Sequence, residues 1–139
     1  MLGDPANVAS RLEGQTKTYY VDIIIGEATA NQVRHFALLE LDLIQVVGKT
    51  QPVRIFFLFG DETVRNTEAF GSIECAHDAM IAAYRNQQWT QAREHLESCR
   101  SQAPEILQGV YLLYERRIAD LRADPPPADW DGVFAALTK

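Results

Sequence analysis

The stretch GDPANVASRLEG, residues 3–14, constrains the fold more than any other part of the chain. Asp4 is a favourable N-cap residue, and Pro5 suits the first helical position, where its missing N–H would have no helical partner. Gly14 is typical of the end of a short helix, although Lys17 and Tyr19 could still be helical. The pattern therefore predicts a helix that begins after Asp4 and leads into the apolar residues that follow.

On such a helix Asn7 and Arg11 lie one turn apart on the same face. Val8 and Leu12 form a neighbouring apolar row that would face the core. An amide beside a guanidinium on a rigid helix could bind a phosphorylated ligand. Spacing alone favours a plainer interpretation, in which both are polar residues on a solvated face.

The residue order of this stretch resembles the signature helix of class III nucleotidyl cyclases, the adenylate and guanylate cyclase family. In that family a strand, a short helix and a final hairpin with a Lys-Gly-Lys-like turn come next. The same order is found here in Val21–Ile25, Gly26–Thr29, Val47–Lys49 and Val53–Phe59. The resemblance covers residues 1–60. It implies the C-terminal half of a cyclase catalytic domain, with a partial ferredoxin-like sheet of about three strands and two helices.

The resemblance also implies a role for each matched residue. Cyclisation of ATP is an in-line attack of the ribose 3′-hydroxyl on the α-phosphate, with pyrophosphate leaving. The family's helix Asn, which orients the ribose, matches Asn7, and its helix Arg, which stabilises the α-phosphate in the transition state, matches Arg11. Lys49 matches a turn lysine that contacts the β- and γ-phosphates, although by itself it is an ordinary solvated lysine. Val47 replaces the first lysine of the family turn.

The resemblance assigns no metal ligand to this chain. Full-length family enzymes use Mg²⁺ or Mn²⁺ with ATP, and their metal-binding aspartates lie upstream of the signature helix. Asp4, Asp22, Asp42 and Asp61 are not at those positions. Family sites form between two cyclase domains, so we expect a second cyclase domain as partner, in a homodimer or a complementing chain. The isolated chain is expected to be inactive, and adenylate cyclase is the favoured parent activity.

Composition and charge limit the class of protein. With 139 residues, 47% apolar and 23% charged, the chain has the composition of a soluble globular protein. A net charge of −6 and a pI near 5.0 argue against a nucleic-acid partner. No apolar run approaches the roughly 20 residues of a membrane span, and the N-terminus lacks the basic start and apolar core that are typical of a signal peptide. We expect a cytoplasmic location, with membrane attachment only through an absent upstream region.

The first half of the chain predicts a sheet. Tyr19–Ile25 is a β-branched run typical of a strand buried on both faces. Residues 26–33 predict a short helix with an acidic first turn. A strand over 36–47, a turn over 48–52 and a strand over 53–59 follow.

Residues 36–47 alternate between apolar and polar side chains. The alternation places Leu39, Leu41 and Leu43 inside the sheet and Glu40 and Asp42 outside. It slips at Leu43-Ile44, which suggests a bulge at that point.

The period becomes helical beyond Gly60, which predicts two regions, 1–60 and 61–139. A polar connection over 61–66 precedes three expected helices, separated at 86–88 and before Pro104. The inward stripes of these helices are Phe70, Ile73, Met80, Ile81 and Tyr84, then Trp89, Ala92, Leu96 and Cys99, then Leu107, Val110, Tyr111, Tyr114, Ile118 and Leu121.

The first two of these helices resemble one tetratricopeptide unit. The small and large positions of that repeat match Ala82-Ala83-Tyr84, Trp89, Ala92, Leu96, Cys99 and Pro104. A single unit does not make a solenoid, because such repeats bury their faces by stacking on neighbours. We therefore expect a helical extension packed on the sheet domain or on a partner, rather than a peptide-binding array.

The tail opens with the stiff run Pro125-Pro126-Pro127. Trp130, Val133 and Phe134 predict an anchor that packs onto the body of the protein. The Trp-Asp-Gly-Val segment resembles the C-terminus of some bacterial cyclases, and a Pro-rich ligand for another domain is the alternative.

The cysteines and histidines lack the spacing of metal sites. Cys75 and Cys99 lie on apolar helical stripes without a CxxC motif, so we expect both to be buried, reduced thiols. His35, His77 and His95 are expected to be surface or packing residues.

The sequence thus leaves three functions open. The first is a C-terminal fragment of a nucleotidyl cyclase that carries the Asn/Arg helix without the metal site. The second is a non-catalytic nucleotide-binding or regulatory module that has kept the helix. The third is a structural dimerisation unit, because the apolar faces of Val21–Ile25 and Val53–Phe59 need covering.

Overall fold

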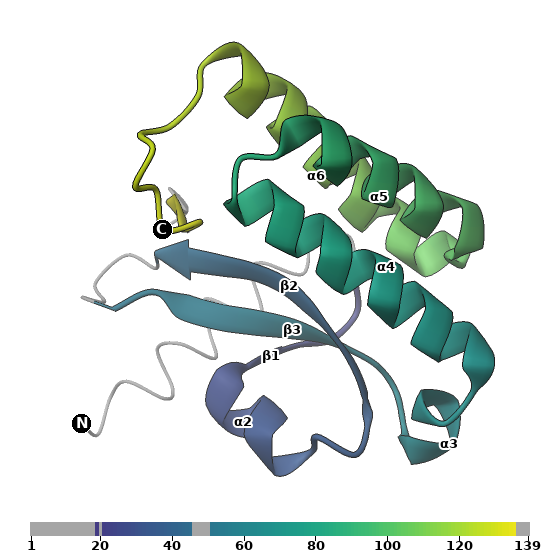
Figure 1. Ribbon diagram of the computed structural model, residues 1–139. Helices are drawn as coiled ribbons and strands as arrows, with labels where there is room; N and C mark the ends of the chain where they lie inside the picture. The colour runs from purple at the N-terminus through teal and green to yellow at the C-terminus, as the bar shows by residue number, and fades with distance from the viewer. Residues whose placement is uncertain (1–18, 20, 46–50, 136–139) are drawn as a thin grey trace. The chain divides into compact units, whose positions relative to one another are not determined.

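The computed structural model describes residue 19 and residues 21–45 and 51–135 (Figure 1). The chain divides into two compact units. The sheet unit comprises residues 1–65 and 133–139, and the helical unit comprises residues 66–132. The division falls after Arg65 rather than after Gly60, and the chain returns to the sheet unit at Val133.

The sheet unit contains a mixed set of short helices and strands. The described strands lie in the order β1-β3-β2-β4, in which β1, β3 and β2 are antiparallel and β4 pairs in parallel with the end of β2. The expected α+β class is confirmed. The bounds are β1 Ile24–Gly26, α2 Glu27–Gln32, β2 Ala37–Gln45, β3 Val53–Gly60, α3 Glu62–Arg65 and β4 Phe134–Ala135.

One face of the sheet is covered by α2, which begins directly after β1 with Glu27 in its first turn, as the sequence predicts (Figure 1). Ala30 of α2 packs with Leu38 and Phe56 in a small buried cluster. The Arg34 guanidinium lies 5.0 Å from the centre of the Phe56 ring, in a cation–π contact. The helix thus supplies an apolar contact to β2 and β3, and Arg34 in the segment after it supplies a cation–π contact.

A β-bulge in β2 changes which side chains face inward. Glu40 lies opposite Phe56 and Asp42 lies opposite Ile55, so Leu41 is the extra residue. The alternation suggested a bulge at Leu43-Ile44. The observed bulge lies slightly earlier in the strand, at Leu41. The prediction that Asp42 points outward is therefore wrong, because Asp42 is fully buried. Leu43, which was predicted to face inward, is only half-buried.

The first strand is shorter than the sequence predicts. β1 spans only Ile24–Gly26 and pairs with β3 on one side. Among the described strands β1 is at the edge of the sheet, and its residues are half-buried. Ile23 just ahead of it is 47% exposed. Tyr19 and Val21 are buried, but Asp22 and Ile23 are exposed, so the predicted burial on both faces does not extend over residues 22–25.

The expected polar connection contains a short helix, α3. Asp61 begins it, and its Oδ1 accepts a hydrogen bond from the Val64 N–H at 3.1 Å. The Arg65 guanidinium then donates to the carbonyl oxygen of Phe36 at 3.2 Å. The bond from Arg65 attaches α3 to the segment that enters β2.

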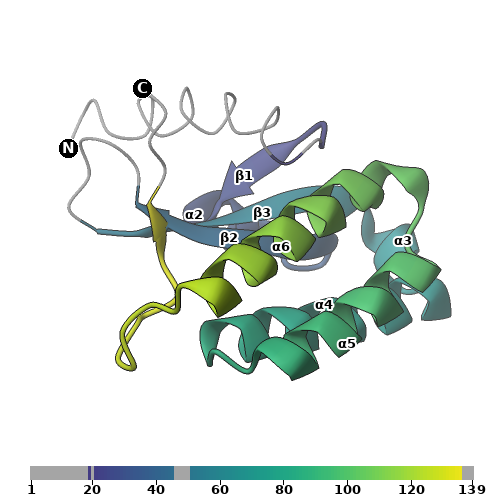
Figure 2. The same ribbon diagram turned by 90° about the horizontal axis from the view of Figure 1, so that it is seen from above.

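The helical unit consists of α4 (Glu68–Arg85), α5 (Trp89–Gln102) and α6 (Glu105–Ala123), which lie side by side (Figure 2). Thr67 caps α4, because its side chain accepts a hydrogen bond from the Phe70 N–H at 3.2 Å. The predicted helices and their breaks are confirmed. Their inward stripes are buried, except that Trp89 and Leu121 are half-buried.

Beyond α6 the residues 124–132 form a loop, here named the strap, that folds back on the helices. Trp130 packs against Tyr84 and Trp89, with ring centres 5.4 Å and 6.4 Å apart. The Gln87 side chain donates to the Pro127 carbonyl oxygen at 2.7 Å. The predicted Trp130 anchor is confirmed. Phe134, by contrast, is 37% exposed and is held through the backbone pairing of β4.

Cys75 departs from the expected burial. It is exposed on α4, whereas Cys99 on α5 is buried. Ile73 and His77, two positions either side of Cys75, are both buried. Two helical positions correspond to about 200° of rotation, so Cys75 points away from the buried face.

Candidate functional site

The three residues predicted to form the nucleotide site, Asn7, Arg11 and Lys49, lie outside the residues that the structure describes. Their geometry is therefore not part of the site described below. Two described residues adjoin them along the chain. Tyr19 follows the segment that carries Asn7 and Arg11, and Asp42 lies on β2, the strand that precedes Lys49.

Tyr19 and Asp42 form a buried hydrogen-bonded pair. The Tyr19 hydroxyl donates to Asp42 Oδ2 at 2.6 Å, a length typical of a charge-assisted bond to a carboxylate. Asp42 Oδ1 accepts a second hydrogen bond, from the Leu43 N–H at 2.8 Å. Tyr19 is 1% exposed and Asp42 is 0% exposed. The Asp42 side chain thus accepts a hydrogen bond at each of its two oxygens, as a buried polar group requires.

The bulge in β2 is what brings Asp42 to this position. Residues directly opposite on antiparallel strands share a face, so Asp42 shares the face of Ile55, and Leu39 shares that of Phe57. Ile55 and Phe57 are alternate residues of β3 and lie on one face. Without the extra residue, strict alternation would place Asp42 on the α2 face beside Glu40. The bulge moves it to the opposite, apolar face.

A second ionic cluster lies on the α2 face. Arg54 of β3 donates from Nη1 to Glu40 Oε2 at 2.5 Å, and its Nε lies 3.7 Å from Glu27 Oε2. The three side chains come from β3, β2 and α2, and all are partly exposed. Partly exposed ion pairs of this kind contribute little to stability.

The core of the helical unit contains a polar contact between its three helices. His77 Nδ1 of α4 lies 2.9 Å from the Tyr111 hydroxyl of α6. Burial raises the pKa of the Cys99 thiol of α5 from 9.0 to about 11, while a hydrogen bond with Tyr111 opposes the rise. Burial likewise raises the pKa of Tyr111 above its usual 10.0. A thiol with so high a pKa stays protonated at neutral pH, so Cys99 is a packing residue and not a nucleophile.

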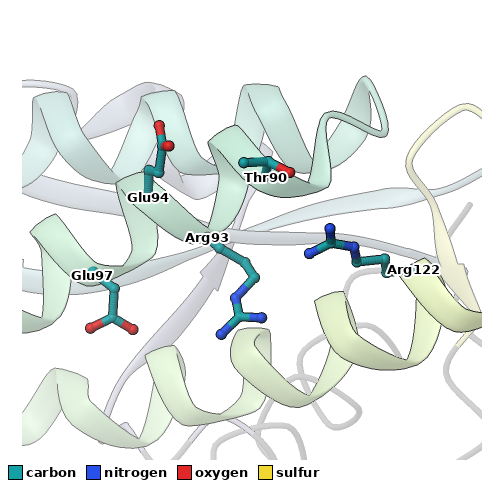
Figure 3. A pocket seen from close by; sticks show the side chains of 5 residues that line it. All are labelled: Thr90, Arg93, Glu94, Glu97 and Arg122. Carbon is teal, nitrogen blue, oxygen red and sulfur yellow. The ribbon is translucent and has the colours of Figure 1, made fainter.

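An open groove of about 310 Å³ lies on the helical unit, lined by Thr90, Arg93, Glu94, Glu97 and Arg122. Figure 3 shows Arg93 and Glu97 projecting from α5 toward α6, with Arg122 at the end of α6. All five lining residues are exposed. Two arginines and two glutamates on an open surface offer neither a nucleophile nor a desolvated charge, and the groove carries no chemistry of its own.

The part of the chain that the structure describes contains neither a cluster of metal-binding side chains nor a membrane-spanning helix. Within residues 19, 21–45 and 51–135, no group of three His, Cys, Asp or Glu side chains could hold a metal ion. Across the same residues, no helix has the length and apolar character needed to cross a bilayer.

A scan against protein-family models, a search of curated proteins and a search of solved structures each found no match to this chain.

Sequence reasoning missed the Tyr19–Asp42 pair. It placed Tyr19 in a strand and Asp42 on the solvent side of another. The sequence did contain one signal of this pair. Asp42 is the single carboxylate in the otherwise apolar run Leu41–Ile44, close to the suggested bulge. A buried acid of this kind needs a donor, and Tyr19 is a suitable one.

Proposed function

We propose that this chain contributes the ribose- and phosphate-binding half of a class III nucleotidyl cyclase site, most simply that of an adenylate cyclase. In this proposal residues 1–60 are the C-terminal half of the catalytic domain, and the helices beyond it are a tetratricopeptide-like extension. The reaction is the conversion of ATP to cyclic AMP and pyrophosphate.

One observation carries the proposal. The GDPANVASRLEG stretch is followed in the structure by a strand, a short helix and a two-stranded hairpin, in the order that the resemblance implies. β1, α2 and the β2–β3 hairpin supply that order, with Lys49 between the two hairpin strands in the sequence. The agreement of motif and following topology supports a cyclase more than either feature alone.

In this function each proposed residue acts on a different part of the nucleotide. Asn7 orients the ribose, and Arg11 neutralises charge that develops on the α-phosphate, a task suited to a planar guanidinium that stays charged. Lys49 contacts the β- and γ-phosphates. The resemblance matches no residue of this chain to the metal-binding aspartates, so Mg²⁺ or Mn²⁺ with ATP would be held by a second cyclase domain.

The test is complementation. This chain is mixed with a class III cyclase domain that keeps its metal aspartates but lacks its own helix Arg, and cyclic AMP is measured with MnATP. We expect activity only in the mixture. Arg11→Ala should lower kcat by about 10²–10³-fold, as for loss of one preorganised donor.

The matched control is Arg116→Ala, which removes an exposed arginine of α6 far from the motif in sequence. It should leave the activity of the mixture unchanged. Complemented activity that survives Arg11→Ala would rule out the proposed role of Arg11.

A second function is favoured by the exposed apolar side chains of the sheet. Among the described strands, β1 and β4 are the outer strands of the sheet. Ile23, just before β1, is 47% exposed, and Phe134 of β4 is 37% exposed. Such edges pair readily with another chain. The chain would then be a dimerisation unit, which light scattering across a range of concentrations distinguishes from a monomer.

A further inference from the structure

The turn between α4 and α5 contains a residue in an unusual backbone conformation. Gln87 has φ 60°, and among the described residues it is the one non-glycine residue with a positive φ. This left-handed conformation is disfavoured for a residue with a Cβ atom, and glycine is the usual choice for it. Glutamine offers a contact that glycine lacks, because its Nε2 donates to the Pro127 carbonyl oxygen of the strap at 2.7 Å.

Two aromatic residues flank Gln87 in the sequence. Tyr84 near the end of α4 is fully buried and Trp89 at the start of α5 is half-buried, with ring centres 6.1 Å apart. The Trp130 ring of the strap packs on both of them. Aromatic rings and a side-chain donor together suit an extended Pro-rich segment, because the rings contact its apolar side chains while the donor pairs with a backbone carbonyl.

The strap has the properties of a ligand for this surface. Its run Pro125–Pro127 is stiff before binding as well as after it, so little backbone entropy is lost when the segment is fixed. Pro127 provides the carbonyl that accepts from Gln87, and Trp130, three residues later, provides the ring. The recognised pattern is therefore an extended segment in which tryptophan follows proline by three residues.

We propose that Tyr84, Gln87 and Trp89 form a binding site for a partner protein with an extended segment of this pattern, and that the strap is the ligand which the chain itself carries for the site. A partner segment binds by displacing the strap. The strap is then an intramolecular competitor, with an effective concentration on the order of millimolar. All residues of this site lie within 66–132, so its existence does not depend on the proposed function.

The test vacates the site in the full chain with Trp130→Ala and adds a peptide of residues 124–132, DPPPADWDG. Because the chain has two tryptophans, the isotope-labelled variant retains a single indole N–H signal in its NMR spectrum, that of Trp89. The unlabelled peptide should shift this signal in a saturable titration, with a Kd of about 0.1–1 mM. The same peptide with alanine in place of tryptophan should bind at least about tenfold more weakly. Without a saturable shift for DPPPADWDG, the inference is wrong.

A second titration uses the parent protein, in which the strap competes with the peptide. DPPPADWDG should bind the parent about three- to tenfold more weakly than it binds Trp130→Ala. Equal affinities would mean that the peptide binds elsewhere, which would overturn the proposal. Should Trp130→Ala fail to fold, Trp130→Phe takes its place, because it keeps a ring against Tyr84. This variant should still bind the peptide more tightly than the parent does.

The role of the donor is tested by adding Gln87→Gly to the Trp130→Ala chain. Glycine suits the positive φ, so this change removes the amide without straining the turn. The Kd for the peptide should rise about three- to tenfold, as for loss of one hydrogen bond. The matched control is Gln91→Ala, which removes an exposed glutamine of α5 and should leave the Kd unchanged. An equal rise for both variants would refute the assigned role of Gln87.

The strap of a second copy is the other candidate occupant of the site. Light scattering across a range of concentrations should give the parent and Trp130→Ala the same oligomeric state. If the parent dimerised and Trp130→Ala did not, two copies would be exchanging their straps, and the inference of a separate partner would be wrong.

Discussion

The thiol of Cys99 lies in the core of the helical unit, where burial raises its pKa from 9.0 to about 11. Between those values the folded protein keeps the proton that the unfolded chain releases. Folding therefore binds a proton in this range, and the contribution of Cys99 to stability is complete below pH 9 and is lost as pH rises toward 11. The raised pKa of Tyr111 acts in the same direction at higher pH.

We predict that the free energy of unfolding falls by roughly 1 kcal/mol between pH 8 and pH 10 through Cys99. Urea unfolding at several pH values measures this slope. Cys99→Ala should flatten it, even though the variant is less stable at neutral pH. The control is Cys75→Ala, because Cys75 is exposed and its removal should leave the slope unchanged. Equal slopes in the two variants would contradict the prediction.

At the same scale, Asp42 shows what a local pattern cannot determine. The alternation of β2 correctly placed Leu39 and Leu41 inside, and then one extra residue reversed the phase. A bulge depends on the pairing with β3, which a single strand does not reveal. The hydrogen bond from Tyr19 likewise joins residues distant in sequence, so no periodicity could predict it.

At the scale of elements, one large side chain of the strap, that of Trp130, packs against the helices. The Trp130 ring lies edge-to-face with Tyr84, which also contacts Tyr114 at 5.1 Å. Gly132 at the end of the strap has φ +85°, and an added Cβ would lie 2.6 Å from Arg85 Cγ, so only glycine suits this turn. Side-chain packing and backbone conformation together determine the course of the strap.

We predict that Trp130→Ala lowers the free energy of unfolding by about 1–3 kcal/mol, less than for a fully buried aromatic because Trp130 is half-buried. Trp130→Phe should recover part of the loss, since a ring remains against Tyr84. Urea unfolding followed by far-ultraviolet circular dichroism measures both. Asp129→Ala, at the exposed neighbouring position, is the control and should change stability by less than about 0.5 kcal/mol. If Trp130→Ala lowered the free energy of unfolding by as little as Asp129→Ala does, the aromatic contacts would contribute nothing to stability.

The elements also differ in how well the sequence predicts them. α4, α5 and α6 repeat their apolar stripes over several turns, so their positions and buried faces could be predicted. β1 is three residues long, and the apolar run that contains it begins well before the paired residues. The apolar composition therefore predicted a longer strand than the one observed. Strand pairing, rather than β-branched content, decides where an edge strand begins.

At the scale of the whole molecule, the helical unit interrupts the sheet unit in sequence. The chain leaves the sheet unit after Arg65 and returns to it at Val133, where β4 pairs with β2. The apolar periodicity predicted where the helical part begins. It could not predict the return, because β4 is two residues long and is defined only by its partner strand. The proposed nucleotide residues were inferred from residue order alone.

Several contacts join residues of the stretch 66–132 to one another. They include the His77–Tyr111 contact at 2.9 Å, the Arg100–Glu115 ion pair at 2.9 Å and the packing of Trp130 on Tyr84. Because these partners all lie inside the unit, a chain of residues 66–132 should fold without the sheet. We expect a helical circular dichroism spectrum and a cooperative thermal transition, at a temperature below that of the whole protein because small domains bury less of their surface.

The control for this fragment is its Tyr84→Ala variant. Tyr84 is fully buried at the centre of the aromatic cluster, and its removal should cost about 3–5 kcal/mol, comparable to the whole stability of so small a domain. The variant should therefore lose the cooperative transition while the parent fragment keeps it. A parent fragment with the spectrum of an unfolded chain would mean that the helices depend on the sheet unit, and that the two units form one cooperative fold.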